Sequence, residues 1–279
     1  MKEDLTTLDS HFAFGENWKD FVSHVSEERI AEATKGLTRL FPNDELRGKR
    51  FLDVGCGSGL SMLAALRLGA AHVAGLDIDP SSVEAANALL TGHADRQSWE
   101  VHERSALASA VEDLGSFDIV YSWGVLHHSG DMWQAVRKTS RLVNPNGYFA
   151  VALYRRTPMD RFWVVEKRLY SRASPILQRL IRWIYCSAFF AAKLLSGRNP
   201  VAYVKDYAKK RGMNWAHDVH DWLGGYPYET QTPGEVASLL AADGFTLVRE
   251  YVDRTNTVGL GLFGSNVDEF VLKREQASQ

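Results

Sequence analysis

The sequence predicts an α/β fold: a Rossmann-like, seven-stranded, mostly parallel sheet with an antiparallel last strand, plus N-terminal helices and a helical insertion. From Lys49 onward, short apolar runs that suit buried strands alternate with helical segments, which is typical of repeated βα units. The chain ends in two strand-like segments joined by the glycine-rich stretch 259–266. That connection is too short for a helical crossover, so the last two strands are expected to be antiparallel.

The elements follow in a regular order. Before residue 49 we expect two helices, one with an apolar face over 18–25 and one over 27–40 that stops before Pro42. The five strands of the alternating region are expected at 49–54, 72–78, 99–104, 117–123 and 148–154. The helices between them are expected at 60–69, at 81–90 with Asp79 as N-cap, and at 131–143, ended by the turn 144–147.

The alternation stops at Thr157. Residues 158–225 carry no strand pattern but many aromatic side chains at helical spacing, and a core pattern returns at Thr232, which forms a capping box with Glu235. The chain is therefore divided into four parts: an N-terminal helical lid (1–48), a Rossmann-like core (49–157), a helical insertion that covers the substrate (158–225) and the C-terminal part of the core (226–279).

The composition is that of an ordinary globular protein. The chain has 279 residues, 45% hydrophobic and 24% charged, with a net charge of −2, which excludes disorder and a coiled coil. No apolar run reaches the roughly 18 residues of a spanning helix, and the N-terminus lacks the apolar core of an export signal. The two cysteines, Cys56 and Cys186, suit a reducing compartment. We expect a cytoplasmic protein.

The charge is unevenly distributed. Residues 155–211 hold 14 Lys or Arg side chains and only three acidic ones, so the rest of the chain is acidic. This asymmetry indicates a partner for the basic part: an anionic ligand, a membrane surface or the acidic body itself. A basic amphipathic helix can lie on a membrane, line a pocket for an apolar or anionic molecule, or serve as an ordinary lid with a solvated arginine face.

The most informative stretch is the glycine loop, residues 53–59, between the first strand and its helix. Gly55, Gly57 and Gly59 let the backbone turn sharply and approach a ligand closely. The loop lies at the carboxyl edge of the strands, where open α/β sheets bind ligands. Its spacing, G-x-G-x-G, differs from the dinucleotide fingerprint, and the carboxylate of Asp53 directly before it would repel a pyrophosphate.

A second carboxylate belongs to the same edge. Asp77 ends the second strand, where it can accept hydrogen bonds from both hydroxyls of a ribose. The two aspartates and the bare loop together favour a nucleoside that carries a positive charge and no phosphates. Cys56, inside the loop, is interpreted as a small packing residue rather than a nucleophile, because no base is placed to activate it.

The segments FLDVGCGSGL, GLDIDP and FDIVYSWGVLHH resemble the glycine-loop, acidic-loop and fourth-strand motifs of class I S-adenosylmethionine-dependent methyltransferases. The likeness is greatest to the small-molecule branch typified by quinone-biosynthesis methyltransferases, and it spans about residues 49–154 and the final strands. It implies that S-adenosylmethionine is the cofactor. It further implies that Asp53, Gly55 and Gly57 line the methionine moiety of this cofactor. Asp77 is expected to hold the ribose, and Ile78 to flank the adenine.

The same resemblance implies further donor contacts. The family often has an acid near the adenine amino group, where this chain has Arg104 and Ser105, so Ser105 is expected to substitute as a polar contact. Trp123 is expected to border the donor, and Cys56 and Gly59 belong to the binding loop. Trp18 is expected either to fold over the donor as part of a lid or to be a core anchor.

Four residues are candidates for substrate binding or proton transfer. Methyl transfer from a sulfonium is an in-line displacement, which needs a base only where the acceptor atom must lose a proton. His127 and His128 follow the fourth strand at the mouth of the site, although either could simply hydrogen-bond a loop carbonyl. His220 and Tyr226 lie in the polar stretch 217–229. A metal site there would need several side chains to converge, so none is expected.

The sequence therefore predicts a methyltransferase that modifies an oxygen or carbon atom, ahead of nitrogen, of a small or lipid-like molecule. An NAD-type dehydrogenase is disfavoured by Leu60, where a glycine would be expected. A catalytically silent donor-binding regulatory protein stays an alternative. A further alternative is a nucleic-acid methyltransferase that uses the basic insertion. Methyltransferases that modify the amino groups of nucleic-acid bases carry an Asn/Asp-Pro-Pro-aromatic run after the fourth strand, where this chain has Ser122-Trp123-Gly124. No nucleic-acid partner is therefore expected. Peripheral membrane contact and the oligomeric state are left open.

Overall fold

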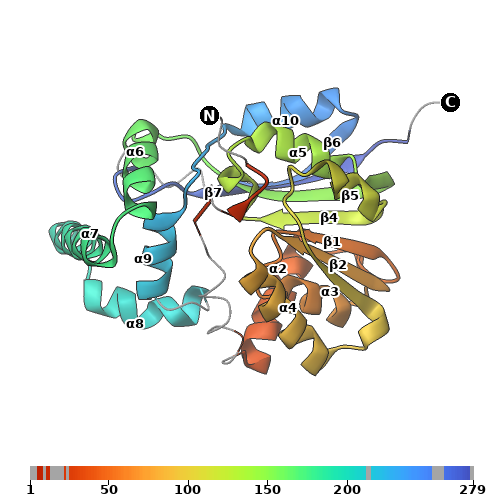
Figure 1. Ribbon diagram of the computed structural model, residues 1–279, viewed down its shortest axis with the longest axis horizontal. Coiled ribbons are helices and arrows are strands. Elements are labelled where there is room, and N and C mark those ends of the chain that lie inside the picture. The colour runs from red at the N-terminus through yellow and green to blue at the C-terminus, as the bar shows by residue number, and fades with distance from the viewer. Residues whose placement is uncertain are drawn as a thin grey trace.

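A seven-stranded sheet organises the molecule, in the order β3-β2-β1-β4-β5-β7-β6 (Figure 1). The computed structural model describes residues 5–8, 11–12, 22, 25–211, 215–252 and 261–276, and within these all side chains but those of residues 206, 208–211 and 217. The strands are β1 (Arg50–Val54), β2 (His72–Asp77), β3 (Trp99–Glu103), β4 (Phe117–Trp123), β5 (Val143–Tyr154), β6 (Phe245–Tyr251) and β7 (Val267–Arg274). Strands β1 to β5 are parallel, and β7 is antiparallel to both of its neighbours.

The predicted sheet is confirmed: β6 and β7 are antiparallel, and β7 also pairs with β5, so it lies between the two. Two local details differ from the prediction. The expected turn at 144–147 is a bulge within β5. Phe117 of β4 pairs with Val143, but Ile119, only two residues later, pairs with Tyr148, so the residues between Val143 and Tyr148 bulge out of the register. The preceding helix ends at Ser140, not at residue 143.

Helices cover both faces of the sheet. On one face lie α2 (Glu27–Leu40), α3 (Leu60–Arg67) and α4 (Pro80–His93), and on the other lie α5 (Met132–Ser140) and α10 (Pro233–Ala242). Short 3₁₀ helices, η2 (Arg96–Ser98), η3 (Ser109–Leu114) and η4 (Leu126–His128), occupy loops. The predicted caps are confirmed: Asp79 accepts the N–H of Ser81, and Glu235 accepts that of Thr232.

A separate group of helices stands beside the sheet, at the left of Figure 1. It comprises α6 (Asp160–Ser171), α7 (Pro175–Leu195), α8 (Pro200–Arg211) and α9 (Trp215–Gly224). The chain leaves the sheet and returns at one place, since the N–H of Arg156 donates to the carbonyl of Gln231 at 2.8 Å. Arg155 and the side-chain amide of Gln231 both bind the fully buried carboxylate of Asp268 on β7.

These helices have a core of their own, formed by aromatic and aliphatic side chains that include Trp163, Tyr170 and Leu223. Among the described residues no helix is both long and apolar enough to cross a bilayer. The helix expected over 18–25 lies outside the described residues, except for Val22 and Val25.

Candidate functional site

The loops after β1, β2 and β4 meet at the carboxyl edge of the sheet. β1 pairs with β2 on one side and with β4 on the other, and the strand order reverses between β1 and β4. In open α/β sheets this switch point forms the crevice that binds ligands. The glycine loop therefore lies where a ligand is expected.

The glycine loop requires its glycines. Gly55, Gly57 and Gly59 have φ angles of 75°, 51° and 76°, a region that residues with a Cβ rarely adopt. A Cβ on Gly55 would lie 2.3 Å from Cγ1 of Val125. The loop is fixed to β2, because the N–H of Gly55 donates to the carbonyl of Leu76 at 2.7 Å.

Cys56 points beneath this loop rather than into the edge. It is buried, and its Sγ would lie 3.0 Å from a Cβ built on Gly75 of β2. Burial raises the pKa of its thiol, with the charges of Asp77 and Asp53 acting in the same direction. The thiol is therefore protonated at neutral pH and packs as a small side chain.

Asp77 ties the loops after β1 and β2 together. Its Oδ2 accepts the N–H of Gly57 and its Oδ1 accepts the N–H of Asp79, each at 2.9 Å. Burial raises its pKa to about 6, against the lowering effect of these two hydrogen bonds. Because each carboxylate oxygen has a second lone pair, Asp77 can still accept hydrogen bonds from a diol.

Asp53 is a buried carboxyl group next to a second one. It is 3% exposed and lies on β1, in register with Gly75 of β2 and Tyr121 of β4. Burial, and then the negative charge of Asp77, raise its pKa to about 8. A cation bound between the two carboxylates would remove this repulsion, so the pair selects a positively charged ligand.

Three of the other residues expected to contact the donor are described by the structure. Ile78 follows β2 and is half-buried, and Ser105 is buried, its Oγ accepting the N–H of Leu107 at 3.2 Å. Trp123, at the end of β4, is 49% exposed and donates its Nε1–H to Oε1 of Glu269 at 2.8 Å. Trp18 lies outside the described residues.

His127 and His128 are buried neutral imidazoles. The Nδ1 of His127 accepts the N–H of Tyr154 at 3.2 Å, which places its proton on Nε2, an atom with no hydrogen-bond partner in the described part of the chain. Burial lowers the pKa of His127 well below its ordinary value. The Nδ1–H of His128 donates to the carbonyl of Pro227 at 2.7 Å, so its lone pair is on Nε2; burial lowers the pKa of His128 to about 3.

His220 lies on α9, and Tyr226 follows the end of that helix. Nδ1 of His220 lies 2.6 Å from the hydroxyl of Tyr170, and Phe12 packs edge-on against its ring at 5.3 Å. The carbonyl of Tyr226 accepts the N–H of Phe12 at 2.9 Å. Phe12 therefore contacts both α9, which carries His220, and the loop after it, which carries Tyr226. Among the described residues no three His, Cys, Asp or Glu side chains gather as a metal site requires.

Sequence reasoning missed Lys167. Its side chain is fully buried on α6, its Nζ lies 3.6 Å from the ring centroid of Trp222, and it donates to the carbonyl of Trp222. Burial lowers its pKa to about 7, and burial raises the pKa of Glu166 to about 7. Tyr154, whose ring lies 3.8 Å from that of His127, also packs against Trp222 and links this cluster to the histidines. Nothing in the sequence distinguishes Lys167 from the neighbouring basic residues.

Residues 52–151 match the family model of a methyltransferase domain. The chain is 36% identical over 139 residues to a ubiquinone biosynthesis O-methyltransferase of Azorhizobium caulinodans, covering 48% of this chain and 53% of the relative. It is 38% identical over 113 residues to one of Brucella ovis, covering 40% and 44%. The chain thus spans about half the length of the curated relatives it matches.

Solved structures share the fold at low identity. Magnesium protoporphyrin IX methyltransferase from Synechocystis with bound SAH has a TM-score of 0.54 at 14% identity, covering 94% of each chain. PKMT2 from Rickettsia typhi in complex with AdoHcy has a TM-score of 0.55 at 15% identity, covering 84% of this chain and 50% of that one. The [4+2]-cyclase SpnF, at 0.52 and 14%, covering 86% and 80%, also has this fold. The fold alone therefore leaves the reaction open.

Proposed function

We propose that this chain, which carries a class I S-adenosylmethionine-dependent methyltransferase domain, transfers a methyl group to an oxygen or carbon atom, less readily a nitrogen atom, of a small or lipid-like molecule. The observation that carries the proposal is a pair of neighbouring aspartates, Asp53 buried and Asp77 half-buried, beside a glycine loop. Asp53 has a raised pKa next to Asp77, and Asp77 fixes the loop through Gly57.

The residues at the carboxyl edge fit the donor. A sulfonium would meet the carboxylate of Asp53, and a ribose would meet the half-buried carboxylate of Asp77. Ile78 and Ser105 would flank the adenine, Gly55 and Gly59 would keep the loop backbone close to the ligand, and Trp123 would border it. When bound, S-adenosylmethionine supplies an electrophilic methyl group. The protein contributes mainly by holding donor and acceptor in line, which can lower the barrier by about 7–11 kcal/mol.

We propose His128 as the base for an acceptor that must lose a proton. Its Nδ1–H is held by Pro227, so Nε2 carries the lone pair. Because burial lowers the pKa of His128 to about 3, the proposal requires the bound acceptor to raise this pKa as the proton is transferred. His127, with its proton on Nε2, would donate a hydrogen bond to the acceptor oxygen instead. His220 on α9 and Tyr226 on the loop after it are proposed as acceptor-binding residues.

The remaining parts of the proposal concern access to the site. The helices α6 to α9 would cover the acceptor. Of the N-terminal part, residues 1–48, only the stretch before α2 would act as a lid, because α2 packs on the sheet and Phe12 contacts His220. A lipid-like acceptor would be reached through peripheral membrane contact of the basic helical segment. The two cysteines are free thiols, which supports a cytoplasmic location.

The test combines donor binding with acceptor identification. Isothermal titration with S-adenosylmethionine should show binding, which Asp77→Ala should weaken at least tenfold. Incubation with methyl-labelled donor and fractionated cell extract, followed by mass analysis, should then show a small or lipid-like molecule that gains a methyl group. Donor binding without any labelled product would contradict the proposal in favour of a regulatory role, and a labelled nucleic acid would contradict the acceptor class.

The role of His128 is tested on the identified acceptor. His128→Gln should lower kcat about 10²–10⁴-fold if a proton is transferred, because general-base catalysis typically contributes that much. The donor affinity should stay unchanged, and this is the control for folding. An unchanged kcat in His128→Gln would eliminate it as the base.

A further inference from the structure

We propose that the outward face of α7 docks flat on a bilayer surface that contains anionic phospholipid. α7 runs for 21 residues without one fully buried side chain, and it is the outermost of the four helices beside the sheet (Figure 1). Seven of its large apolar side chains are between 47% and 90% exposed: Ile176, Leu177, Leu180, Trp183, Ile184, Leu194 and Leu195. Contiguous apolar exposure of this extent marks an interaction surface.

The exposed side chains form one stripe along the helix. Ile176, Leu180 and Trp183 are spaced at i, i+4 and i+7, and Leu194 continues the same face near the C-terminal end of the helix. The opposite face is already used. Ile181 and Tyr185 pack on the core of the helical group, and the hydroxyl of Tyr185 donates to the carbonyl of Phe263 at 2.9 Å. The fold therefore holds α7 in place and leaves a second apolar face without a partner among the described residues.

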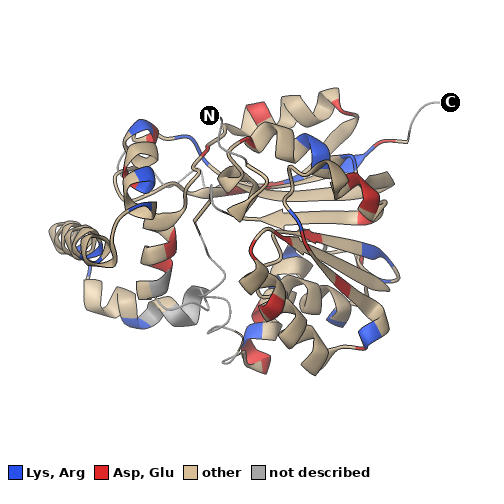
Figure 2. Cartoon of the chain, viewed as in Figure 1, with Lys and Arg blue, Asp and Glu red and all other residues tan. Residues whose placement is uncertain are grey.

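The charge around this face selects an anionic surface. Residues 168–205 contain seven Lys or Arg side chains and no Asp or Glu. Arg179 is exposed beside the stripe, whereas acidic residues lie on α9, nearer the sheet (Figure 2). An apolar helix face bordered by cations is the chemistry of a helix that lies in the headgroup region of anionic lipids. The face is confined to a helix that cannot span the bilayer, so the contact is peripheral.

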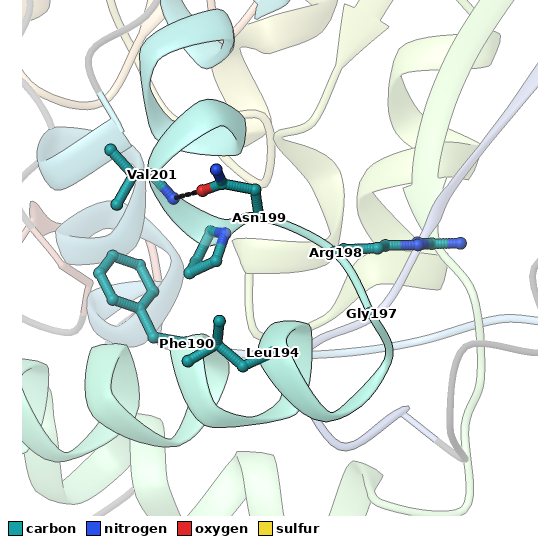
Figure 3. A pocket seen from close by; sticks show the side chains of 7 residues that line it. Phe190, Leu194, Gly197, Arg198, Asn199 and Val201 are labelled. Atoms are coloured by element: carbon teal, nitrogen blue, oxygen red, sulfur yellow. Dashed lines mark hydrogen bonds between the residues drawn. The ribbon is translucent and has the colours of Figure 1, made fainter.

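A recess continues the apolar surface beyond the end of α7. It has a volume of about 660 Å³ and lies between α7 and the start of α8. Phe190, Leu194 and Val201 line it, and Arg198 points away from it at the rim (Figure 3). Leu194 belongs both to the recess and to the exposed stripe, so the two are one surface. The apolar walls suit an acyl chain, and the guanidinium suits a phosphate.

This inference is linked to the proposed function at one point: a lipid-like acceptor would explain why the protein docks on a bilayer. The docking itself needs neither donor nor methyl transfer, so the two can fail separately. Vesicle binding without any labelled methyl product would contradict the proposed function alone. Methyl transfer to a dissolved acceptor without vesicle binding would contradict the docking alone.

The test is cosedimentation of the full chain with phosphatidylcholine vesicles, with and without about one third phosphatidylglycerol. Binding is expected only to the anionic vesicles and should weaken with added salt. The triple variant Leu180→Gln, Trp183→Ser, Ile184→Gln should bind at least tenfold more weakly. Arg179→Gln and Arg198→Gln should each cost about fivefold, since a Lys or Arg near an anionic surface contributes about 1 kcal/mol.

The control is Val248→Gln on β6, which changes an apolar side chain of similar exposure away from α7 and should not alter vesicle binding. All substituted side chains are exposed, and unchanged donor affinity and circular dichroism verify folding. Failure of the wild type to sediment with anionic vesicles would overturn the proposal, as would equal binding of the triple variant. A dimer that the triple variant abolishes, without vesicle binding, would identify the face as a protein interface instead.

Discussion

Asp53 is a buried carboxyl group whose charge state depends on what lies beside it. The group is 3% exposed and lies next to Asp77, so its negative charge is unfavourable in the protein alone and its pKa is raised to about 8. The free energy of unfolding therefore depends on pH. The fold is more stable with Asp53 protonated, and this stability is lost as the pH rises from 3.8, the ordinary pKa of an aspartate, through about 8. A sulfonium ligand reverses this preference, because it is attracted only by the carboxylate.

We therefore expect donor affinity to rise with pH. Between about pH 6 and 8, binding must remove a proton from Asp53, so the affinity should increase by up to about tenfold per pH unit and level off above 8. Titration calorimetry in two buffers of different ionisation enthalpy measures the proton released. In Asp53→Asn the affinity should be lower at pH 8 and nearly independent of pH; a pH dependence as steep as that of the wild type would assign the effect to another group.

The backbone conformation of the glycine loop requires its glycines. Gly55→Ala would introduce a Cβ 2.3 Å from Val125 at a φ of 75°, and overpacking of this kind costs about 1–3 kcal/mol. We expect that loss in denaturant unfolding and at least a tenfold loss of donor affinity.

The matched control is Gly36→Ala in the middle of α2. A Cβ there meets nothing within 4 Å, so this substitution should stabilise the protein by about 0.5–1 kcal/mol and leave donor affinity unchanged. Normal donor binding by Gly55→Ala would show that the loop tolerates side chains and would remove the steric argument.

The elements that the sequence predicted well are those with strong local signals. The helix over Glu27–Leu40 and the strand over Phe117–Trp123 have the expected bounds, because Pro42 and the apolar run mark them locally. The position of β7 between β5 and β6 depends on long-range pairing, which no local pattern encodes. The same holds for Lys167, since its burial against Trp222 results from the packing of α6 on α9.

At the scale of the whole molecule, the two parts differ in how they are held together. The sheet is enclosed by two hydrophobic cores, one on each face, and β4 is buried along most of its length. The helices beside it share a smaller aromatic core, to which α7 contributes only partly buried side chains. Where the chain leaves the sheet, Arg155 binds the fully buried carboxylate of Asp268 on β7. Contacts from the helices themselves include the Nε1–H of Trp163, which donates to the carbonyl of Gly261 at 2.7 Å.

This difference predicts a gradient of local stability that hydrogen exchange can measure. Amides open with free energies that follow burial and packing, so those of α7 should exchange at least about 100-fold faster than those of β4. Donor should slow exchange in the glycine loop and the loop after β2 but not in α7, whereas anionic vesicles should slow exchange in α7 alone. Protection of α7 equal to that of β4 without vesicles would contradict this ordering, because it would mean that the outward apolar face is already covered in solution.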